Sequence, residues 1–572
     1  MTFLSVAFAS LLGVVLLATL LAERGIKSIG LAPHKVKFPG PGALPFFGNF
    51  LELRKGHARA FVRWADKFGP IIRVVLGDRE AVILNTYGAV QKTLISQGQA
   101  FAGRPQFRMY HGLFATAADH EAPPTLGTTP WSDKVSTYRK HLGLQTAGHK
   151  LRRYNHFVAR RLFRFVNLLA EDAKRGPRDL GWHLWSSTIG LSADMCFGCR
   201  IDEDEARIIS YAEIDIFREP RTLGQPFHIA VPLVDYTQRA LRPLRPLFTA
   251  MGSTFFDEID AAEERAKTLR KTEIGYVGRL KEETKARVKA GDQTPSQLGD
   301  IMRTFGDSYT AFDEYKVATS LVGSGMGTGT LILWLAAMVA SMPEIQKKAQ
   351  EAIEAEYGNE NPDPLDTDRV EYITALGLEA GRYYASTRLG FPRETIEDVT
   401  IDGVLIPKGT IVAHNTYSVN RDPARYDYVD EFIPERWLDG HYGRVSEKGA
   451  RVGLPHLTNG AGRRYCLGVP YVNKMLYGTI ILLCHFFKME RAPLDKQGLK
   501  EVFPDYRAAA EASPVMDPIA DQIAECAAQA LPKAAGIRLT PRNPEQLQRW
   551  LEEGHTLMDQ FERADESIGI AN

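Results

Sequence analysis

The pattern of apolar and polar positions predicts a mainly α-helical chain with a smaller β-rich part. Residues 57–68 and 312–342 follow helical patterns, and the second stretch is mostly apolar and contains no proline. A helix of that length is long enough to cross a large domain. Several further helices are expected within 150–290. Apolar runs within 74–85 and 399–410, each broken by a turn signal, predict pairs of short strands.

Length and composition favour one large domain that follows an N-terminal anchor. The chain has 572 residues, 44% of them hydrophobic, with no internal repeat and no Ser/Gly linker or charge block in its interior. Phe3 to Ala22 are apolar or small and uncharged, and about 20 helical residues span a bilayer core. The predicted segments are an anchor over 1–26, a proline-rich hinge over 27–48, a main domain over 49–540 and a C-terminal helical tail over 541–572.

Positive charges follow the apolar N-terminal stretch and indicate its orientation. Arg24, Lys27, Lys35 and Lys37 lie beyond it, and the positive-inside rule places that side in the cytoplasm. The bulk of the chain is therefore expected in the cytosol. A cleaved signal peptide is the alternative, although the stretch lacks the cationic start that such peptides carry.

Charge and cysteine content argue against two broad classes of protein. The formal net charge is +1, which gives no indication of a nucleic-acid partner. The five cysteines are too few and too scattered for a disulfide framework. The composition is otherwise that of an ordinary globular protein.

The candidate chemistry of the chain centres on Cys466, which has glycines on both sides. Gly460 and Gly462 precede it and Gly468 follows it, and glycine permits positive φ and close approach of the backbone to a flat ligand. Pro470 is tolerated only in the first turn of a helix. The pattern therefore predicts a tight loop that leads from Cys466 into a buried helix, whose dipole and free N–H groups favour a thiolate.

Arg464 places a fixed cation two residues before that cysteine. An anionic cofactor that is ligated by Cys466 and held by Arg464 would use every feature of the loop. The alternative is a buried structural cysteine, which is the commoner state of a lone cysteine.

The spacing of these residues resembles the haem-binding signature of the cytochrome P450 family, F-G-x-G-x-R-x-C-x-G. The matching positions are Gly460, Gly462, Arg464, Cys466 and Gly468, and Asn459 stands in place of the phenylalanine. The resemblance implies the cytochrome P450 fold with an N-terminal transmembrane helix, and it makes residues 49–540 a haem-thiolate catalytic domain. It also implies haem b as cofactor, with Cys466 as the axial thiolate ligand of the iron.

Two further stretches are similar to paired signatures of the same family. Glu379 and Arg382 match E-x-x-R, and Pro434 to Trp437 match P-E-R-F/W. Opposite charges three residues apart on a helix are commonplace by themselves. The resemblance implies that Glu379, Arg382 and Arg436 form a buried charge network that holds the haem-side core.

Two arginines are candidates for binding the haem propionates. Arg139 occupies the arginine position of the family's W-x-x-x-R, although Val135 stands at the tryptophan position and Trp131 lies one turn earlier. Arg393 follows a run that the resemblance places beside the haem edge. Solvated cations are the alternative for both residues.

The apolar helix contains G-S-G-M-G-T-G over 323–329, where the family has (A/G)-G-x-(D/E)-T-(T/S). Gly325 and Thr328 match this pattern, but Gly327 takes the acid position and Gly329 the last one. The spacing does not fit a dinucleotide-binding loop. The resemblance makes Thr328 the catalytic alcohol, and we expect it to work with ordered water or substrate hydroxyls. The missing acid raises the odds of phenol coupling or a rearrangement.

Loops and strand ends near the expected cavity supply candidate substrate contacts. They are Phe107, Phe114, Leu321, Gly325, Leu389 and Phe391. Ordinary packing and incidental loop aromatics are the alternatives.

The resemblance implies a monooxygenase in the endoplasmic reticulum membrane that oxidises a small lipophilic, aromatic secondary-metabolite intermediate. Dioxygen and electrons from NADPH–cytochrome P450 reductase would drive the reaction. Residues 125–140 also look like those of filamentous-fungal members that hydroxylate phenylacetates or couple phenols. Two alternatives remain open. One is oxidative phenol coupling or ring formation without net oxygen insertion, and the other is an NADPH-independent isomerase or a non-catalytic haem protein.

Overall fold

The structure, a computed structural model, describes most of the chain between residues 35 and 567. The described residues are 35–44, 47–53, 56–77, 79–106, 125–218, 241–250, 252, 255–438, 454–502, 517–523 and 529–567. The predicted anchor over 1–26, part of the hinge over 27–48, and the candidate substrate contacts Phe107 and Phe114 lie outside these residues.

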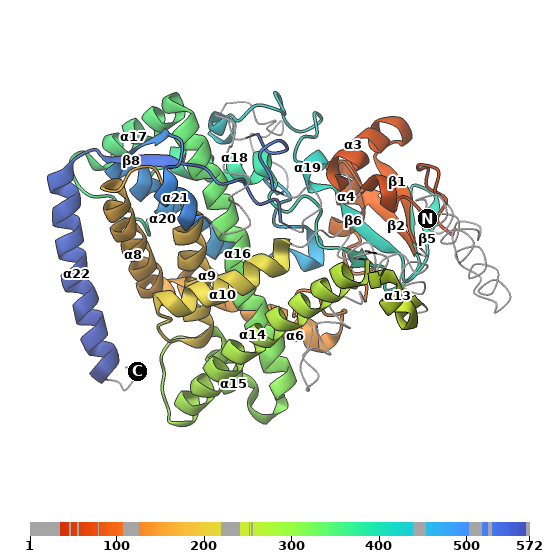
Figure 1. Cartoon of the computed structure of the whole chain (residues 1–572), viewed down its shortest axis with the longest axis horizontal. Helices are drawn as coiled ribbons and strands as arrows, with labels where there is room; N and C mark the ends of the chain where they lie inside the picture. Colours follow the sequence, from red (N-terminus) through yellow and green to blue (C-terminus); the bar gives the residue numbers. More distant parts are fainter. Residues whose placement is uncertain are drawn as a thin grey trace.

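Helices form most of the described molecule (Figure 1). The predicted helix over 57–68 is α3 (His57–Phe68), and the long apolar stretch is the continuous helix α16 (Ala311–Ser341). The other long helices are α6 (Asp133–Gln145), α8 (Asn155–Ala173), α9 (Gly181–Phe197), α10 (Glu203–Arg218), α14 (Phe255–Lys289), α15 (Gln297–Phe305), α17 (Pro343–Tyr357), α18 (Glu371–Tyr384), α20 (Val469–Phe486) and α22 (Pro544–Ser567). The shorter ones are α2 (Phe50–Leu53), α4 (Tyr87–Val90), α7 (Gly148–Leu151), α13 (Arg245–Ala250), α19 (Thr416–Val419) and α21 (Lys496–Glu501).

The β-rich part lies at one end of the molecule, beside α3 (Figure 1). Its sheet has the order β1-β2-β6-β3, and β2 and β6 pair in parallel. The strands are β1 (Ile71–Leu76), β2 (Arg79–Leu84), β3 (Arg393–Glu394) and β6 (Ile411–His414). The hairpin predicted over 399–410 is β4 (Val399–Ile401) and β5 (Val404–Ile406), with φ of 49° at Asp402 and 79° at Gly403.

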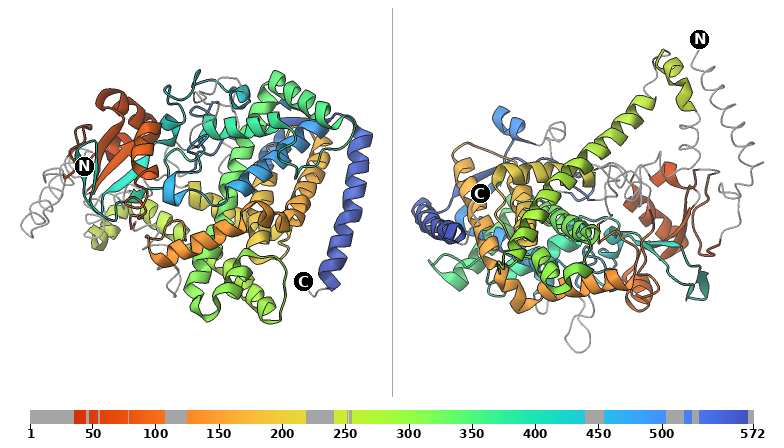
Figure 2. Two further views of the ribbon diagram at one scale, coloured as in Figure 1. Left: turned by 180° about the vertical axis from the view of Figure 1, so that it is seen from behind. Right: turned by 90° about the horizontal axis from the view of Figure 1, so that it is seen from below.

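The C-terminal segment is part of the packed structure. β8 (Ile537–Pro541) pairs with β7 (Phe487–Arg491), and α22 runs along the outer side of α8 (Figures 1 and 2). The ring of Trp550 lies 5.5 Å from that of Phe163 and 5.0 Å from that of Phe486, measured between centroids. The predicted tail over 541–572 is therefore anchored by aromatic contacts along its described part.

Helix α16 lies in the middle of the helical part and packs most extensively against α9 (Figure 1). It begins with a capping box between Thr310 and Asp313. A Cβ on Gly325 would stand 2.5 Å from the carbonyl oxygen of Thr188, and one on Gly329 would stand 2.6 Å from Thr188 Oγ1. These two glycines therefore let α9 approach α16. The sequence predicts Gly325 in the substrate pocket, but the structure places it against α9.

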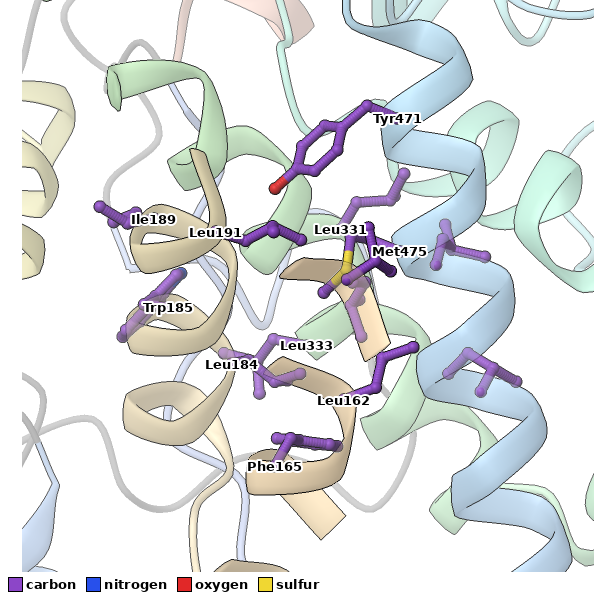
Figure 3. Packing of buried hydrophobic residues seen from close by; sticks show 14 of the residues in the cluster. Leu162, Phe165, Leu184, Trp185, Ile189, Leu191, Leu331, Leu333, Tyr471 and Met475 are labelled. Carbon is purple, nitrogen blue, oxygen red and sulfur yellow. The ribbon is translucent and has the colours of Figure 1, made fainter. Parts of the chain in front are cut away.

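Apolar side chains of four helices interlock around this contact. Figure 3 shows Leu184 of α9 beside Leu333 of α16, with Leu162 of α8 close by. Met475 of α20 lies beside Leu331 of α16 in the same view. All of them are buried. Among the residues that the structure describes, α16 is the one helix long and apolar enough to cross a membrane, but 83% of its most apolar window is buried inside the protein, as in a core helix.

A buried ion pair that the sequence did not reveal joins α8 to α9. Asp194 of α9 is fully buried, and its carboxylate accepts hydrogen bonds from Arg161 at 2.8 and 2.9 Å and from Arg160 at 3.2 Å. It also accepts the backbone N–H of Ile201 at 2.9 Å. Burial opposes the charge of Asp194, but the two guanidinium groups and these hydrogen bonds hold its pKa below the usual value.

We expect Asp194→Asn to lower the free energy of unfolding by about 3–5 kcal/mol, because it leaves two buried guanidinium groups without their counter-charge. Chemical denaturation followed by circular dichroism measures this change. Since the folded pKa of Asp194 is lowered, the pair stabilises the fold above the unfolded-state pKa of about 3.9 and loses that contribution as pH falls through the folded pKa. The variant should lack this acid-dependent loss.

The matched control is Asp204→Asn, which removes an exposed carboxylate from neighbouring α10. Its stability should stay within about 0.5 kcal/mol of the wild type. Equal stability of the wild type and the Asp194 variant between neutral and acidic pH would contradict the assignment of this pair.

Candidate functional site

A cavity of about 390 Å³ separates α16 from the loop that carries Cys466. On one side it is lined by residues of α16, among them Gly327 and Thr328. On the other side Gly460, Cys466 and Gly468 form part of its wall. Further lining comes from α6, α9, α10, α14, α15, α20 and β6, from the segment around Phe391, from the described residues near Thr125, and from Gln529. The cavity is large enough for a flat cofactor beside a small ligand.

The backbone of the cysteine loop has the conformation that its glycines allow. Gly460 has φ of 79° and Gly462 has φ of 57°, and both values are unfavourable for other residues. A Cβ on Gly462 would overlap the carbonyl oxygen of Leu94, at 1.7 Å. Gly468 has an ordinary φ of −82° and lies at the N-terminus of α20, where a Cβ would stand 3.7 Å from the Cys466 sulfur.

The Cys466 thiol faces the cavity, and the surface that it exposes is cavity surface rather than the outside of the protein. Burial raises the pKa of this thiol above its usual value, while the N–H groups of Gly468 and Val469 and the Arg139 guanidinium oppose that effect. The free protein therefore keeps a thiol here. A coordinated metal ion would deprotonate it.

Four arginine side chains converge on the cavity beside Cys466: Arg104, Arg139, Arg393 and Arg464. All four donate hydrogen bonds of 2.7–3.5 Å to backbone carbonyl groups. Arg104 donates to Gly127, Phe391 and Pro392, and Arg464 donates to Ala102, Leu126 and Thr129. Arg139 donates to Tyr465, and Arg393 donates to Ala461. None of the four forms an ion pair with a carboxylate of the described chain. Arg104, Arg393 and Arg464 are buried, and Arg139 is half-buried.

The four guanidinium groups repel one another, and this repulsion adds to the effect of burial on the pKa values of Arg104, Arg393 and Arg464. Burial, and then the neighbouring guanidinium groups, lower the pKa of Arg393 and of Arg464 to about 9. The same causes lower the pKa of Arg104 well below its usual value. Nε of Arg393 has no hydrogen-bond partner among the described residues. Because buried charge is costly unless it is paired, this cluster fits an anionic ligand, and a flat group with two carboxylates above a cysteine meets that requirement.

Arg104 is a functional candidate that the sequence analysis missed. It belongs to the run F-A-G-R-P, Phe101 to Pro105, which resembles the entry to a loop that lies over the haem in the cytochrome P450 family. That resemblance was the signal that could have found it. The ring of Phe391 lies 5.9 Å from the Arg104 guanidinium, so this arginine also touches a predicted substrate contact.

The opposite wall of the cavity contains an unsatisfied hydroxyl. Thr328 is buried, lines the cavity, and its Oγ1 has no hydrogen-bond partner among the described residues. Position 327 has space for a side chain, since a Cβ on Gly327 would meet only Gln529 Nε2 at 3.5 Å. Leu321 and Phe391 line the cavity as the sequence predicts. Leu389 instead packs against the apolar cluster under the sheet.

Glu379 lies at the centre of a second buried charge cluster, which is complete. Arg382 donates to its two carboxylate oxygens at 2.9 and 2.7 Å, and Arg436 donates to it at 3.1 Å. All three side chains are fully buried. Trp437 Nε1 and the backbone N–H of Ile433 also donate to Glu379, at 2.9 and 2.8 Å. The structure thus brings the predicted triad together and adds Trp437, which the sequence analysis included in the P-E-R-F/W match but not in the charge network.

The cluster connects to the cysteine loop through Asn420. Its side chain donates to the carbonyl groups of Gly381 and Arg382, each at 3.3 Å, and accepts the N–H of Leu457 at 2.9 Å. Leu457 lies at the start of the loop that leads to Gly460 and Cys466. Displacing the cluster would therefore disturb the cavity floor.

A cysteine lies beside four arginines that lack a carboxylate partner in the described part of the chain, and it faces a long helix across the cavity. This arrangement defines a site for an anionic, cysteine-ligated cofactor. The sequence profile of the cytochrome P450 family matches residues 38–501. The chain is 27% identical to the 3-hydroxyphenylacetate 6-hydroxylase of Emericella nidulans over 461 residues, which cover 79% of this chain and 82% of that protein. It is 25% identical to the phenylacetate 2-hydroxylase of the same organism over 527 residues, 91% of this chain and 93% of that protein.

The ferruginol synthase of Isodon rubescens is 25% identical over 487 residues, which cover 81% of this chain and 91% of that protein. The chain belongs to the cytochrome P450 family of monooxygenases, which are oxidoreductases. Membership implies a haem-thiolate iron cofactor, a redox partner and a small-molecule substrate. The cavity residues fit that cofactor, because they offer one thiol and four cations that have no carboxylate partner among the described residues.

We expect Glu379→Ala to yield protein without haem. The change strands two buried guanidinium groups, at a cost of roughly 3–5 kcal/mol, and it loosens the segment that leads to Cys466. The measurement is haem content per mole of purified protein, with circular dichroism to establish how much helix remains. Arg382→Ala should behave in the same way.

Glu371→Ala is the matched control, because Glu371 is an exposed acid on the same helix. It should retain full haem content. A normal haem content in either triad variant would show that the cluster is dispensable for the cofactor site.

Proposed function

We propose that the chain is a membrane-anchored haem-thiolate monooxygenase that oxidises a small lipophilic, aromatic compound. Haem b would lie in the cavity with Cys466 as its axial ligand, and electrons would come from NADPH through cytochrome P450 reductase. The observation that carries the proposal is the Cys466 thiol facing a cavity beside four arginines that have no carboxylate partner in the described chain.

Arginines suit the two propionates of haem b by charge and by geometry. A guanidinium presents several N–H donors in one plane, which matches a carboxylate. Arg139, Arg393 and Arg464 would hold the propionates, and Arg104 adds a fourth cation. When bound, the cofactor supplies dioxygen activation, which a thiolate ligand promotes by donating electron density.

Residues of α16 and its neighbours form the wall of the cavity that would contact the substrate. Leu321, Leu331 and Phe391 offer apolar surface that would hold a ring-shaped substrate and exclude bulk water. The Thr328 hydroxyl could accept and pass on a proton, because its Oγ1 has no hydrogen-bond partner among the described residues.

The names of the relatives support an aromatic substrate. Two of them are described as hydroxylases of phenylacetate or of 3-hydroxyphenylacetate, and each shares about a quarter of its residues with this chain over most of its length. Oxidative phenol coupling is a second candidate, favoured by the glycine at position 327 in place of an acid. In that case the product would contain no new oxygen atom.

The proposed location is the endoplasmic reticulum membrane, with the catalytic domain in the cytosol. The support is the uncharged stretch Phe3 to Ala22, followed by positive charges. The exposed cation Arg463, close to Cys466 in the chain, suits docking of an acidic reductase surface.

We expect the reduced protein to give the carbon monoxide absorption band of thiolate-ligated haem, and Cys466→Ser to lose that band. Cys199→Ser, which changes a half-buried cysteine that does not line the cavity, should keep it. Incubation with phenylacetate and phenols, NADPH, reductase and isotopically labelled dioxygen then separates the two candidates. Product mass increases by one labelled oxygen for hydroxylation and stays free of label for coupling. An unchanged spectrum in the Cys466 variant would overturn the proposal.

A further inference from the structure

Among the described residues, two carboxyl groups line the cavity, and only one of these forms an ion pair within the described chain. Among the described residues that line the cavity, Glu213 and Glu273 are the acidic ones. Glu273 of α14 is paired with Arg270 of the same helix. Glu213 of α10 accepts a hydrogen bond from the Tyr276 hydroxyl at 2.9 Å and forms no ion pair within the described chain. It is 3% exposed and belongs to the lining of the cavity.

Glu213 lies against the helix that lacks its acid. Its Oε2 stands 2.9 Å from the place where a Cβ on Gly323 would be, so this glycine makes room for the carboxyl. Gly323 and Gly327 are about one helical turn apart on α16, a rise of about 6 Å, and both line the cavity. The carboxyl of α10 therefore stands about one turn from the position at which the family carries an acid.

Two unsatisfied polar atoms belong to the lining of the same cavity as this carboxyl. Thr328 Oγ1 and Gln529 Oε1 are both buried, line the cavity, and have no hydrogen-bond partner among the described residues. Thr328 follows Gly327 directly, and Gln529 faces Gly327. Polar atoms of this kind in a roomy cavity are normally satisfied by water, so a short chain of water molecules can join Glu213 to Thr328.

We propose that Glu213 takes the place of the absent acid at position 327 and supplies protons to Thr328 through water. The proposal rests on the monooxygenase function proposed above. Each turnover of such an enzyme consumes one dioxygen, two electrons from the NADPH-dependent reductase and two protons, and it leaves one oxygen atom in the product and one in water. The carboxyl of Glu213 gives a proton to the adjacent water and regains one from solvent, so it ends each turnover unchanged.

The surroundings of Glu213 suit a proton donor at neutral pH. Burial, and then the negative charge of Glu273, raise its pKa to about 8, while the hydrogen bond from Tyr276 and the charge of Arg270 oppose the rise. These three residues belong to α14, and α16 contributes Gly323, which does not titrate. A carboxyl with such a pKa is mostly protonated below pH 8 and exchanges its proton readily.

The decisive experiment uses the holoenzyme with reductase, NADPH and dioxygen but no added substrate. Under these conditions dioxygen is reduced either to hydrogen peroxide, with one NADPH per dioxygen, or to water, with two. Water formation needs proton delivery to cleave the O–O bond. We expect Glu213→Gln to slow the water-forming branch by about 10²-fold, a typical contribution of a general acid, so that peroxide becomes the main product.

Rescue and displacement variants separate this role from a merely structural one. Glu213→Gln combined with Gly327→Asp should restore water formation, since position 327 has space for a side chain. Gly323→Ala should lower it without removing any carboxyl, because the new Cβ displaces Glu213. The matched control, Asp204→Asn on α10, should leave the ratio of hydrogen peroxide to water unchanged.

Two further measurements do not depend on the variants being equally active. In the wild type the water-forming branch should decline as pH rises through about 8, where Glu213 loses its proton, and Glu213→Gln should lack this decline. The infrared spectrum of the wild type at neutral pH should show the carbonyl band of a protonated buried carboxyl, and Glu213→Gln should lose it.

The possible failures are distinguishable. A protein without thiolate-ligated haem or NADPH-dependent dioxygen uptake overturns the proposed monooxygenase. A second outcome is that the protein has thiolate-ligated haem and NADPH-dependent dioxygen uptake while Glu213→Gln changes none of the peroxide-to-water ratio, the pH profile and the infrared band. That result overturns the role of Glu213 alone.

Discussion

Buried positive charge without a counter-charge is the constraint on which the cavity depends. Backbone carbonyl groups satisfy the N–H donors of the four arginines, but they do not neutralise the charge. Burial, and then mutual repulsion, lower the pKa of Arg393 and of Arg464. The side chains come from the segment after Phe101, from α6, from β3 and from the cysteine loop, which are far apart in the sequence. An anionic ligand would stabilise the contacts among these segments, so its binding is coupled to the stability of this part of the fold.

The cluster around Glu379 shows what a completed charge cluster looks like in the same protein. Glu379 neutralises part of the charge of Arg382 and Arg436 directly, and indole and backbone donors fill its remaining lone pairs. The Glu379 carboxylate is buried, and both of its oxygens accept hydrogen bonds from protein groups. Both clusters are rich in buried arginine. The absence of a carboxylate from the cavity cluster of the described chain, rather than the presence of arginine, is what distinguishes a ligand site from a structural one.

Local patterns predicted the parts of this structure that depend on near neighbours in the sequence. The helices over 57–68 and 312–342 and the hairpin over 399–410 follow from periodicity and turn residues. The positive φ of Gly460 and Gly462 follows from their spacing around Cys466. Motifs shared with a family placed Glu379, Arg382 and Arg436 in one cluster, although periodicity alone gives no reason to bring them together.

The misplaced residues have in common that a distant segment decides their surroundings. Gly325 and Leu389 were expected at the cavity, yet α9 covers the first and the sheet cluster packs against the second. Arg104 and the ion pair of Asp194 with Arg161 escaped notice for the same reason. Which face of a helix or strand meets a partner depends on tertiary packing, and the sequence of one element does not contain that information.

The glycines of α16 differ in which neighbouring group a side chain at each position would meet. Gly325 and Gly329 admit α9, and Gly323 admits the carboxyl of Glu213. Gly327 admits nothing closer than ordinary contact, so packing does not require a glycine there. A helix that has lost an acid at one turn and opened space for an acid at the preceding turn fits a transfer of that function from α16 to α10. The carboxyl is then held by Tyr276 of α14 rather than by the cavity wall itself, so its distance from Thr328 varies with any movement of α10 and α14 over α16.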